Sequence, residues 1–557
     1  MFFTLGFALL HLAACQPPPA PPLPTGSVSA VSDMIERLFP GESPHFSLSL
    51  VPSCAGAPGA ANCYTLSDGP GGTISIAGTS ASSLTAALGA YLRDYVNLTI
   101  GWPRGGGSFV AQPAAWPAIG TSVTTSRVVP YGYVMNVCTH SYSLWTYTWE
   151  EWSVFIDWMA LSGINLFLAM TGQEEVQYKV FTALGLNDTT IRTWFNGPAL
   201  LTWSRGQNEY GNDIAGPLPR SWMKAQWDLQ RLILNRTRPL GMIGELPAFQ
   251  GNVPAALKAL RADSNMTIQG DTAWMDSLDP LYGQIADMWM QQLIADFGTD
   301  HWYQLDGYFN GGTAPWRRRN AEVRSPPPAP PAIAAPSARD GSAPACTWTG
   351  LLTDTYLAGC EQNCKGFDAV TDAQAACIAD PLCGGITFTA AQWQLRASAT
   401  PVQSPANEQS YAIANFLQCR GGVTPDPVWI ARGTAAYAGL SRTDPDAIWS
   451  FQGWAIIDWD TVPQAESFSG FVAAVPQGKF VVIDMSVDGT GEWQKWNMAS
   501  FFGAPFIWTT LHDFGGTDGL KGDLARINRI PFDGLLPTAN STVWGTGATP
   551  EGIDQVR

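Results

Sequence analysis

The sequence has 557 residues, of which 46% are hydrophobic and 14% are charged, and its formal net charge at pH 7 is −16. A globular chain of this length is expected to fold into about two to four domains. Its negative charge argues against nucleic acid and anionic membrane surfaces as partners, because both repel an acidic protein.

Residues 1–15 have the features of a targeting segment. Phe2 to Ala14 is apolar but too short to cross a bilayer, and a proline-rich stretch follows it. This pattern predicts a cleaved signal peptide, with the cysteine in Leu12-Ala-Ala-Cys15 leaving a lipid-anchored alternative. No later stretch is long and apolar enough for a transmembrane helix, so no membrane span is expected.

Sequons and cysteines indicate an oxidising compartment. Five Asn-X-Ser/Thr triplets predict a glycosylated surface, at Asn97, Asn187, Asn235, Asn265 and Asn540. Apart from Cys15, nine cysteines remain. Cys54 and Cys63 are close enough to form a small loop, six lie between Cys346 and Cys419, and Cys138 is left unpaired. We therefore expect the secretory pathway, with an extracellular or lysosome-like lumen as the destination.

Residues 28–115 predict a small α/β domain. Helical spacing is found at 31–38 and 79–95, and residues 72–77 alternate between apolar and polar as a strand does.

Alternation of apolar strands and amphipathic helices then continues through residues 126–318 and 427–557. Seven strands are expected, at 128–135, 164–170, 242–249, 302–306, 448–454, 480–485 and 505–511. Helices are expected at 149–163, 222–240 and 281–297. No glycine-rich nucleotide fingerprint follows any of these strands. The pattern predicts a (β/α)8 TIM-type barrel with one strand unidentified, and active-site residues at the C-terminal ends of the strands.

The barrel is interrupted. Residues 319–345 form a linker rich in proline and alanine that cannot pack a core. Residues 346–420 contain six cysteines and resemble an apple/PAN module, with disulfides favoured over zinc. Because the linker follows a strand, this insert is expected to leave the barrel beside the mouth of the active site.

Four segments carry a family resemblance. They are Asn136-Val-Cys-Thr-His-Ser-Tyr-Ser143, Phe155-Ile-Asp-Trp-Met-Ala-Leu-Ser-Gly-Ile-Asn-Leu166, Gly197-Pro-Ala-Leu200 and Trp508-Thr-Thr-Leu-His-Asp-Phe-Gly-Gly516. With them, residues 28–318 and 427–554 resemble the family 89 glycoside hydrolases, the α-N-acetylglucosaminidases. The resemblance implies removal of terminal α-linked N-acetylglucosamine from glycans of the heparan sulfate kind. In that family a long helical domain follows the segment matching residues 545–552, and it is expected to be missing here.

The resemblance implies a retaining mechanism with two carboxylates and no metal or organic cofactor. The nucleophile segment of the family matches Ile483-Asp-Met-Ser-Val-Asp488, which makes Asp488 the nucleophile, with nearby Glu492 as the alternative. The acid/base segment matches Asp306-Gly-Tyr-Phe-Asn-Gly311, where glycine replaces the family's glutamate. Asp306 or the downstream Glu322 would then have to donate the proton.

Substrate contacts are also implied by the resemblance. Their expected positions are Asn136, Cys138, Trp203, Asn310, Trp454 and His512, with Asp513 beside the last where the family has asparagine. The partners expected are a glycan ending in N-acetylglucosamine and a protein or carbohydrate ligand for the cysteine-rich insert. Because of Gly311, the alternative function is a sugar-binding pseudoenzyme, in which the insert supplies a second contact.

Overall fold

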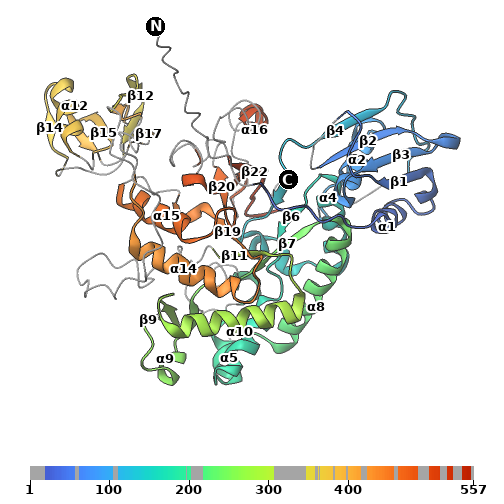
Figure 1. The fold of residues 1–557 in the computed structure, drawn as a ribbon, viewed down its shortest axis with the longest axis horizontal. Helices are drawn as coiled ribbons and strands as arrows, with labels where there is room; N and C mark the ends of the chain where they lie inside the picture. Colours follow the sequence, from blue (N-terminus) through green and yellow to red (C-terminus); the bar gives the residue numbers. More distant parts are fainter. Residues whose placement is uncertain are drawn as a thin grey trace, which may run out of the picture.

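The structure is a computed structural model that describes residues 19–56, 62–104, 111–195, 197–201, 217–305, 346–357, 362, 364–380, 383–396, 399, 401–404, 406–414, 423–456, 462–486, 493, 501–514, 524–530 and 542–553. They form three parts (Figure 1): a central barrel, an N-terminal α/β domain on one side of it, and a small sheet domain on the other side.

The N-terminal domain is a four-stranded sheet with two helices. Its strands β1 (Phe46–Leu50), β2 (Cys63–Asp68), β3 (Ile74–Gly78) and β4 (Val123–Ser126) are ordered β1-β3-β2-β4. Its helices are α1 (Val28–Leu38) and α2 (Ala81–Asp94), and α2 begins with a side-chain cap from Ser80. Strand β4 lies beyond the predicted limit at residue 115. The predicted disulfide between Cys54 and Cys63 is present, with a sulfur–sulfur distance of 2.11 Å.

The central part confirms the predicted (β/α)8 barrel. Eight parallel strands close in the order β11-β19-β20-β21-β22-β5-β6-β7. They are β5 (Tyr131–Val134), β6 (Leu166–Leu168), β7 (Ile243–Pro247), β11 (Trp302–Gln304), β19 (Ile448–Gln452), β20 (Phe480–Ser486), β21 (Phe506–Thr510) and β22 (Val543–Ala548).

Helices surround the barrel, as Figure 1 shows for the long α8 and α10. The described ones with more than four residues are α4 (Trp149–Leu161), α5 (Gln173–Ala183), α6 (Asp188–Trp194), α8 (Arg220–Thr237), α10 (Pro280–Phe297), α14 (Pro427–Ser441), α15 (Val462–Ala474) and α16 (Leu524–Ile530), and the short helices are α3 (Thr139–Tyr142) and α9 (Leu257–Leu260). Helix α4 begins with a capping box between Thr148 and Glu151. A small sheet that the sequence analysis did not predict, β8 (Asn252–Pro254), β9 (Met266–Gln269) and β10 (Thr272–Met275), follows β7.

Strand β22 is the eighth strand, which the sequence pattern did not reveal. Two glycines interrupt its apolar alternation, and glycine is a poor strand former. The structure explains both, since a Cβ on Gly547 would lie 2.2 Å from the carbonyl oxygen of Tyr133, and one on Gly545 would lie 2.8 Å from that of Tyr131. The glycines that weaken the strand signal are therefore the residues that let β22 close the barrel against β5.

The cysteine-rich insert leaves the barrel after β11 and returns at α14, as expected. Its larger sheet has the order β12-β18-β15-β16-β14 and packs against α12 (Val370–Ala379). The strands of that sheet are β12 (Leu352–Thr353), β14 (Gly366–Phe367), β15 (Gly385–Thr389), β16 (Gln392–Arg396) and β18 (Gln409–Ala412). Strands β13 (Thr355–Leu357) and β17 (Pro401–Gln403) pair separately.

Disulfides stabilise the insert. Cys377 and Cys383 are joined to each other, and Cys346 and Cys364 each take part in a disulfide bond as well. This supports the expected disulfides over zinc, while the resemblance to an apple/PAN module stays a prediction.

Four of the five sequon asparagines belong to the described chain, and all four are exposed: Asn97, Asn187, Asn235 and Asn265. Their exposure is compatible with glycosylation. Among the described residues, no helix combines the length and the hydropathy that a bilayer crossing requires.

Candidate functional site

The candidate site lies at the C-terminal end of the barrel, where a segment after β5 meets the segments after β21 and β22. Met135 directly follows β5, and its φ of 92° lies in the left-handed region that residues other than glycine rarely adopt. Such strain costs on the order of 1–3 kcal/mol and is typical of functional sites. The strained residue directly precedes Asn136, the first of the predicted substrate contacts.

Asn136 is completely buried, and its side chain shapes the turn after β5. Its Oδ1 accepts a hydrogen bond of 2.9 Å from the backbone N–H of Cys138, and its Nδ2 donates one of 3.5 Å to the carbonyl of Thr549. Cys138 is buried and not disulfide-bonded, as predicted. The structure thus places both residues at the strand end, while a substrate contact by either stays a prediction.

Residues 549–553, which follow β22, tie the site together, and we call them the strap. Thr139 donates through Oγ1 to the carbonyl of Pro550 at 2.6 Å, and the N–H of Ile553 donates to Oγ of Ser143 at 2.8 Å. The N–H of Glu551 donates to the carbonyl of Asp513 at 2.9 Å. Two motifs far apart in the sequence, residues 136–143 and 508–516, are therefore held together through the strap.

Gln452, the last residue of β19, fixes the same turn from inside the barrel. Its Oε1 accepts a hydrogen bond from the N–H of Val137 at 3.4 Å, and its Nε2 donates to the hydroxyl of Tyr133 at 3.1 Å. Gln452 is fully buried. Gln452 was not among the residues predicted from the sequence, although its position directly before Gly453 and Trp454 was a usable signal.

His512 and Asp513 follow β21. The Nδ1 atom of His512 lies 3.4 Å from the carbonyl of Thr510. Asp513 is 1% exposed, and neither of its carboxyl oxygens has a hydrogen-bond partner among the described residues. Burial raises the pKa of Asp513, and nearby His512 opposes that shift. The structure therefore brings an unpartnered carboxyl to the mouth of the barrel.

The predicted catalytic carboxylates Asp306, Asp488 and Glu492 lie outside the described residues, as do Trp203 and Asn310. The backbone of Trp454 is described and belongs to a 3-10 turn, Gly453–Ile456, directly after β19. These assignments stay predictions.

Two residues that flank the predicted nucleophile segment, Asp484 and Trp493, are bonded to each other. Asp484 on β20 accepts a hydrogen bond of 3.2 Å from the N–H of Trp493. The ring of Trp493 stacks on Phe506 of β21, with centroids 6.3 Å apart. Strand β20 and Trp493 are therefore linked to each other and to β21.

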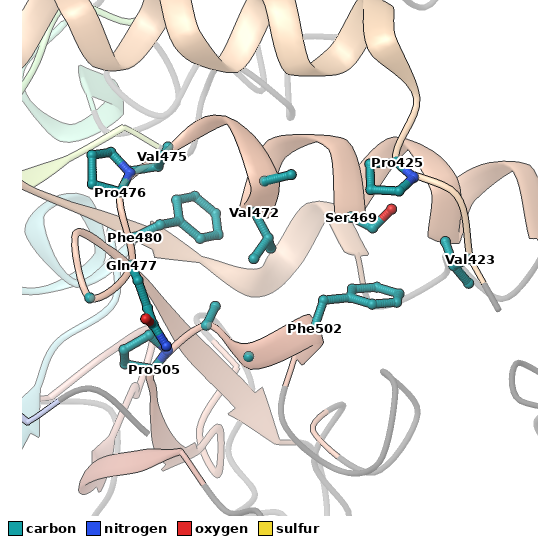
Figure 2. Close-up of a pocket in the computed structure, with 14 residues that line it drawn as sticks. Val423, Pro425, Ser469, Val472, Val475, Pro476, Gln477, Phe480, Phe502 and Pro505 are labelled. Atoms are coloured by element: carbon teal, nitrogen blue, oxygen red, sulfur yellow. The ribbon is translucent and has the colours of Figure 1, made fainter. Parts of the chain in front are cut away.

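An apolar cavity of about 400 Å³ lies elsewhere on the barrel (Figure 2). Its lining includes Val472 of α15, Phe480 at the start of β20, and Pro505 before β21. The first residues of β20 and β21 belong to the N-terminal end of the barrel, opposite the candidate site. Described residues contain no cluster of three His, Cys, Asp or Glu side chains that could hold a metal ion.

Two family models match the chain. The one described as the α-N-acetylglucosaminidase (NAGLU) TIM-barrel domain matches residues 132–324 and 407–557. The one described as the N-terminal domain of the same family matches residues 29–118. Human α-N-acetylglucosaminidase is 30% identical over 538 residues, which are 95% of this chain and 57% of the human protein.

Solved structures show the same fold. A family 89 glycoside hydrolase from Clostridium perfringens, in complex with its substrate GlcNAc-α-1,4-galactose, superposes with a TM-score of 0.64 at 19% identity. A complex of the enzyme with PUGNAc gives 0.64 at 18% identity. Each comparison covers 95% of this chain and 46% of the bacterial one. The chain thus spans little more than half of the human relative's length and less than half of the bacterial one's.

Proposed function

Because the chain belongs to the α-N-acetylglucosaminidase family, we propose that it hydrolyses terminal α-linked N-acetylglucosamine from glycans of the heparan sulfate kind. The observation that carries the proposal is the match of the family's barrel model to residues 132–324 and 407–557. It is supported by the junction of residues 136–143 with Asp513 at the catalytic end of a TIM barrel.

The proposed reaction has two steps with net retention. A carboxylate attacks the anomeric carbon and forms a covalent glycosyl-enzyme, while an acid protonates the departing glycosidic oxygen. Water then attacks the same carbon, gives its proton to the conjugate base of that acid, and releases the sugar and the carboxylate. We assign the nucleophile to Asp488, with Glu492 as the alternative.

The proton donor needs a carboxyl that stays protonated near neutral pH. Asp306 is the candidate from the sequence, because Gly311 stands where the family has its acid. Among the described residues, Asp513 also has suitable properties, since its oxygens are buried without partners and its pKa is raised. We therefore propose Asp306 and Asp513 as the two candidates for the acid.

The second candidate function is that of a catalytically impaired, sugar-binding protein. Gly311 favours this candidate, because it stands where the family has its catalytic acid. A sugar-binding protein would keep the turn at Asn136 and the strap but would not turn the sugar over. We also propose a secretory location, because the disulfides Cys54–Cys63 and Cys377–Cys383 are typical of oxidising compartments.

The test compares two substrates that differ in their leaving group. Purified protein is assayed with nitrophenyl α-N-acetylglucosaminide and with an α-linked N-acetylglucosamine disaccharide, beside Asp488→Ala, Glu492→Ala, Asp306→Asn and Asp513→Asn. The exposed Asp372→Ala on α12 is the matched control.

Loss of the nucleophile should abolish turnover of both substrates. Loss of the acid should lower disaccharide turnover by about 10²–10⁴-fold and affect the nitrophenyl substrate far less, because nitrophenolate leaves without a proton. Binding of N-acetylglucosamine without turnover of either substrate would identify the sugar-binding protein instead. Absence of both binding and turnover would overturn the proposal.

A further inference from the structure

Glu245 is a carboxylic acid in the centre of the barrel. It lies in the middle of β7, and its neighbour Ile243 packs with the residues that fill the barrel, whereas Leu246 packs with the core outside it. Because side chains alternate along a strand, Glu245 points inward together with Ile243. Its exposed fraction is 0%. The sequence analysis treated this strand as apolar and missed the residue.

Two hydroxyl groups face the Glu245 carboxyl, from Tyr133 on β5 and from Ser450 on β19, and no charged side chain among the described residues shifts its pKa. In register, Glu245 pairs with Leu168 on β6. Neither carboxyl oxygen has a hydrogen bond of normal geometry, and neither does the Ser450 hydroxyl. Within the described part of the chain, the barrel therefore encloses the carboxyl without a neighbouring cation.

Burial in such surroundings favours the neutral acid. It raises the pKa of Glu245 from 4.5 to about 7, although the hydroxyls of Ser450 and Tyr133 oppose the shift. An ionised carboxylate would be fully buried and would face no cation among the described residues, which is unfavourable in a low-dielectric interior. The charge state of the barrel centre therefore changes close to neutral pH.

A chain of contacts leads from Glu245 to the candidate site. Tyr133, which faces the carboxyl, accepts the hydrogen bond from Gln452, and Gln452 accepts the hydrogen bond from the N–H of Val137. Val137 lies between Asn136 and Cys138 in the turn after β5. Ionisation of Glu245 would attract the hydroxyl proton of Tyr133 and alter the group that holds Gln452 in place.

We propose that Glu245 is a positioning residue that holds the turn at residues 136–138 in its sugar-binding conformation only while its carboxyl is protonated. The sugar-binding part of this inference rests on the function proposed above. The site would then bind sugar best at acidic pH and loosen as the pH rises past neutrality.

The direction of the pH dependence follows from the link between proton binding and folding stability. In the folded protein Glu245 binds its proton more tightly than in the unfolded chain, so its contribution to stability is complete at low pH and decreases as the pH rises from about 4.5 through about 7. Glu245→Gln keeps the shape but cannot ionise, so it should remove this pH dependence. Ser450→Ala removes a hydroxyl that favours ionisation, so it should move the transition to higher pH.

The experiment measures the turn directly, through the rate at which a maleimide labels the buried Cys138 in the native protein, read by mass spectrometry of its peptide. At pH 8 the wild type should label about 5-fold or more faster than Glu245→Gln, whereas at pH 5.5 the two should agree. Comparing variants at the same pH cancels the ordinary pH dependence of the thiol itself. The exposed Asp372→Asn is the control and should match the wild type.

A second arm measures binding of free N-acetylglucosamine by calorimetry at both pH values. The wild-type dissociation constant should rise by about 5-fold or more between pH 5.5 and 8, while that of Glu245→Gln should change little. Equal labelling of wild type and Glu245→Gln at pH 8 would overturn the inference. If no form binds sugar at either pH, the proposed function fails, and the labelling arm still decides whether Glu245 positions the turn.

Discussion

The two ends of the barrel interior are built from different chemistry. At the N-terminal end, the rings of Tyr131, Trp302 and Trp544 pack together, with Tyr131 5.1 Å from Trp302 and 6.3 Å from Trp544. Toward the C-terminal end, Tyr133, Glu245, Ser450 and Gln452 contribute polar groups, and among the described residues the Glu245 and Ser450 oxygens have no hydrogen bond of normal geometry. The N-terminal end therefore stabilises the barrel, whereas the polar groups at the C-terminal end lower its stability but can act on a ligand.

The largest effect is expected at the aromatic end. Trp302→Ala should lower the free energy of unfolding by about 3–5 kcal/mol, because the ring is 2% exposed and its removal leaves a cavity. Chemical denaturation measures the change. Trp145→Ala is the control, since that ring is 39% exposed, and it should stay within about 0.5 kcal/mol of the wild type. Equal losses in the two variants would contradict the assignment of stability to this end.

A smaller effect is expected where β22 meets β5. Gly547→Ala would place a methyl group 2.2 Å from the carbonyl oxygen of Tyr133, so the strands must separate. The expected loss is about 2–3 kcal/mol, with weaker sugar binding because Tyr133 moves. Gly350→Ala is the matched control, since a Cβ there has no neighbour within 4 Å. An unchanged melting temperature for Gly547→Ala would show that β22 and β5 are not closely packed at this position.

At the polar end, Gln452→Leu should reduce stability by only about 1–2 kcal/mol, because it leaves the N–H of Val137 without its acceptor. The substitution should disturb the site more than the fold. At pH 5.5, maleimide should therefore label Cys138 faster in this variant than in the wild type. Thermal unfolding and labelling on the same sample separate the two. A loss of stability without faster labelling would show that Gln452 stabilises the core but does not hold the turn after β5.

The smallest effect on stability is expected for Asp513→Asn. The pKa of Asp513 is raised by burial, so the carboxylate opposes folding increasingly as the pH rises through that pKa. The amide cannot ionise, so the stability of the variant relative to the wild type should increase slightly, by less than about 1 kcal/mol, between pH 5 and pH 8. Thermal unfolding at both pH values measures this, and a decrease in relative stability between them would contradict it.

The sequence predicted the barrel well because its strands and helices have clear periodicity. It missed β22, where close strand packing requires Gly545 and Gly547, and close packing is invisible in a pattern of polarity. It also missed Glu245, whose neighbours on the strand are apolar. Within the described residues, the predicted Asn136, Cys138 and His512 lie at strand ends as expected. Their partners could not be read from the sequence, since the contact of Asn136 with Thr549 spans 413 residues.

The strap also has a consequence for the order in which this protein matures. Its bonds to Thr139 and Ser143 span 411 and 410 residues, so the turn after β5 leaves the ribosome long before its partners exist. Contacts of such separation form late, because a long loop must close first. Until β22 is made, β5 and β21 present unpaired edges that favour aggregation. A nascent chain of this barrel should therefore depend on chaperones until its last strand has docked.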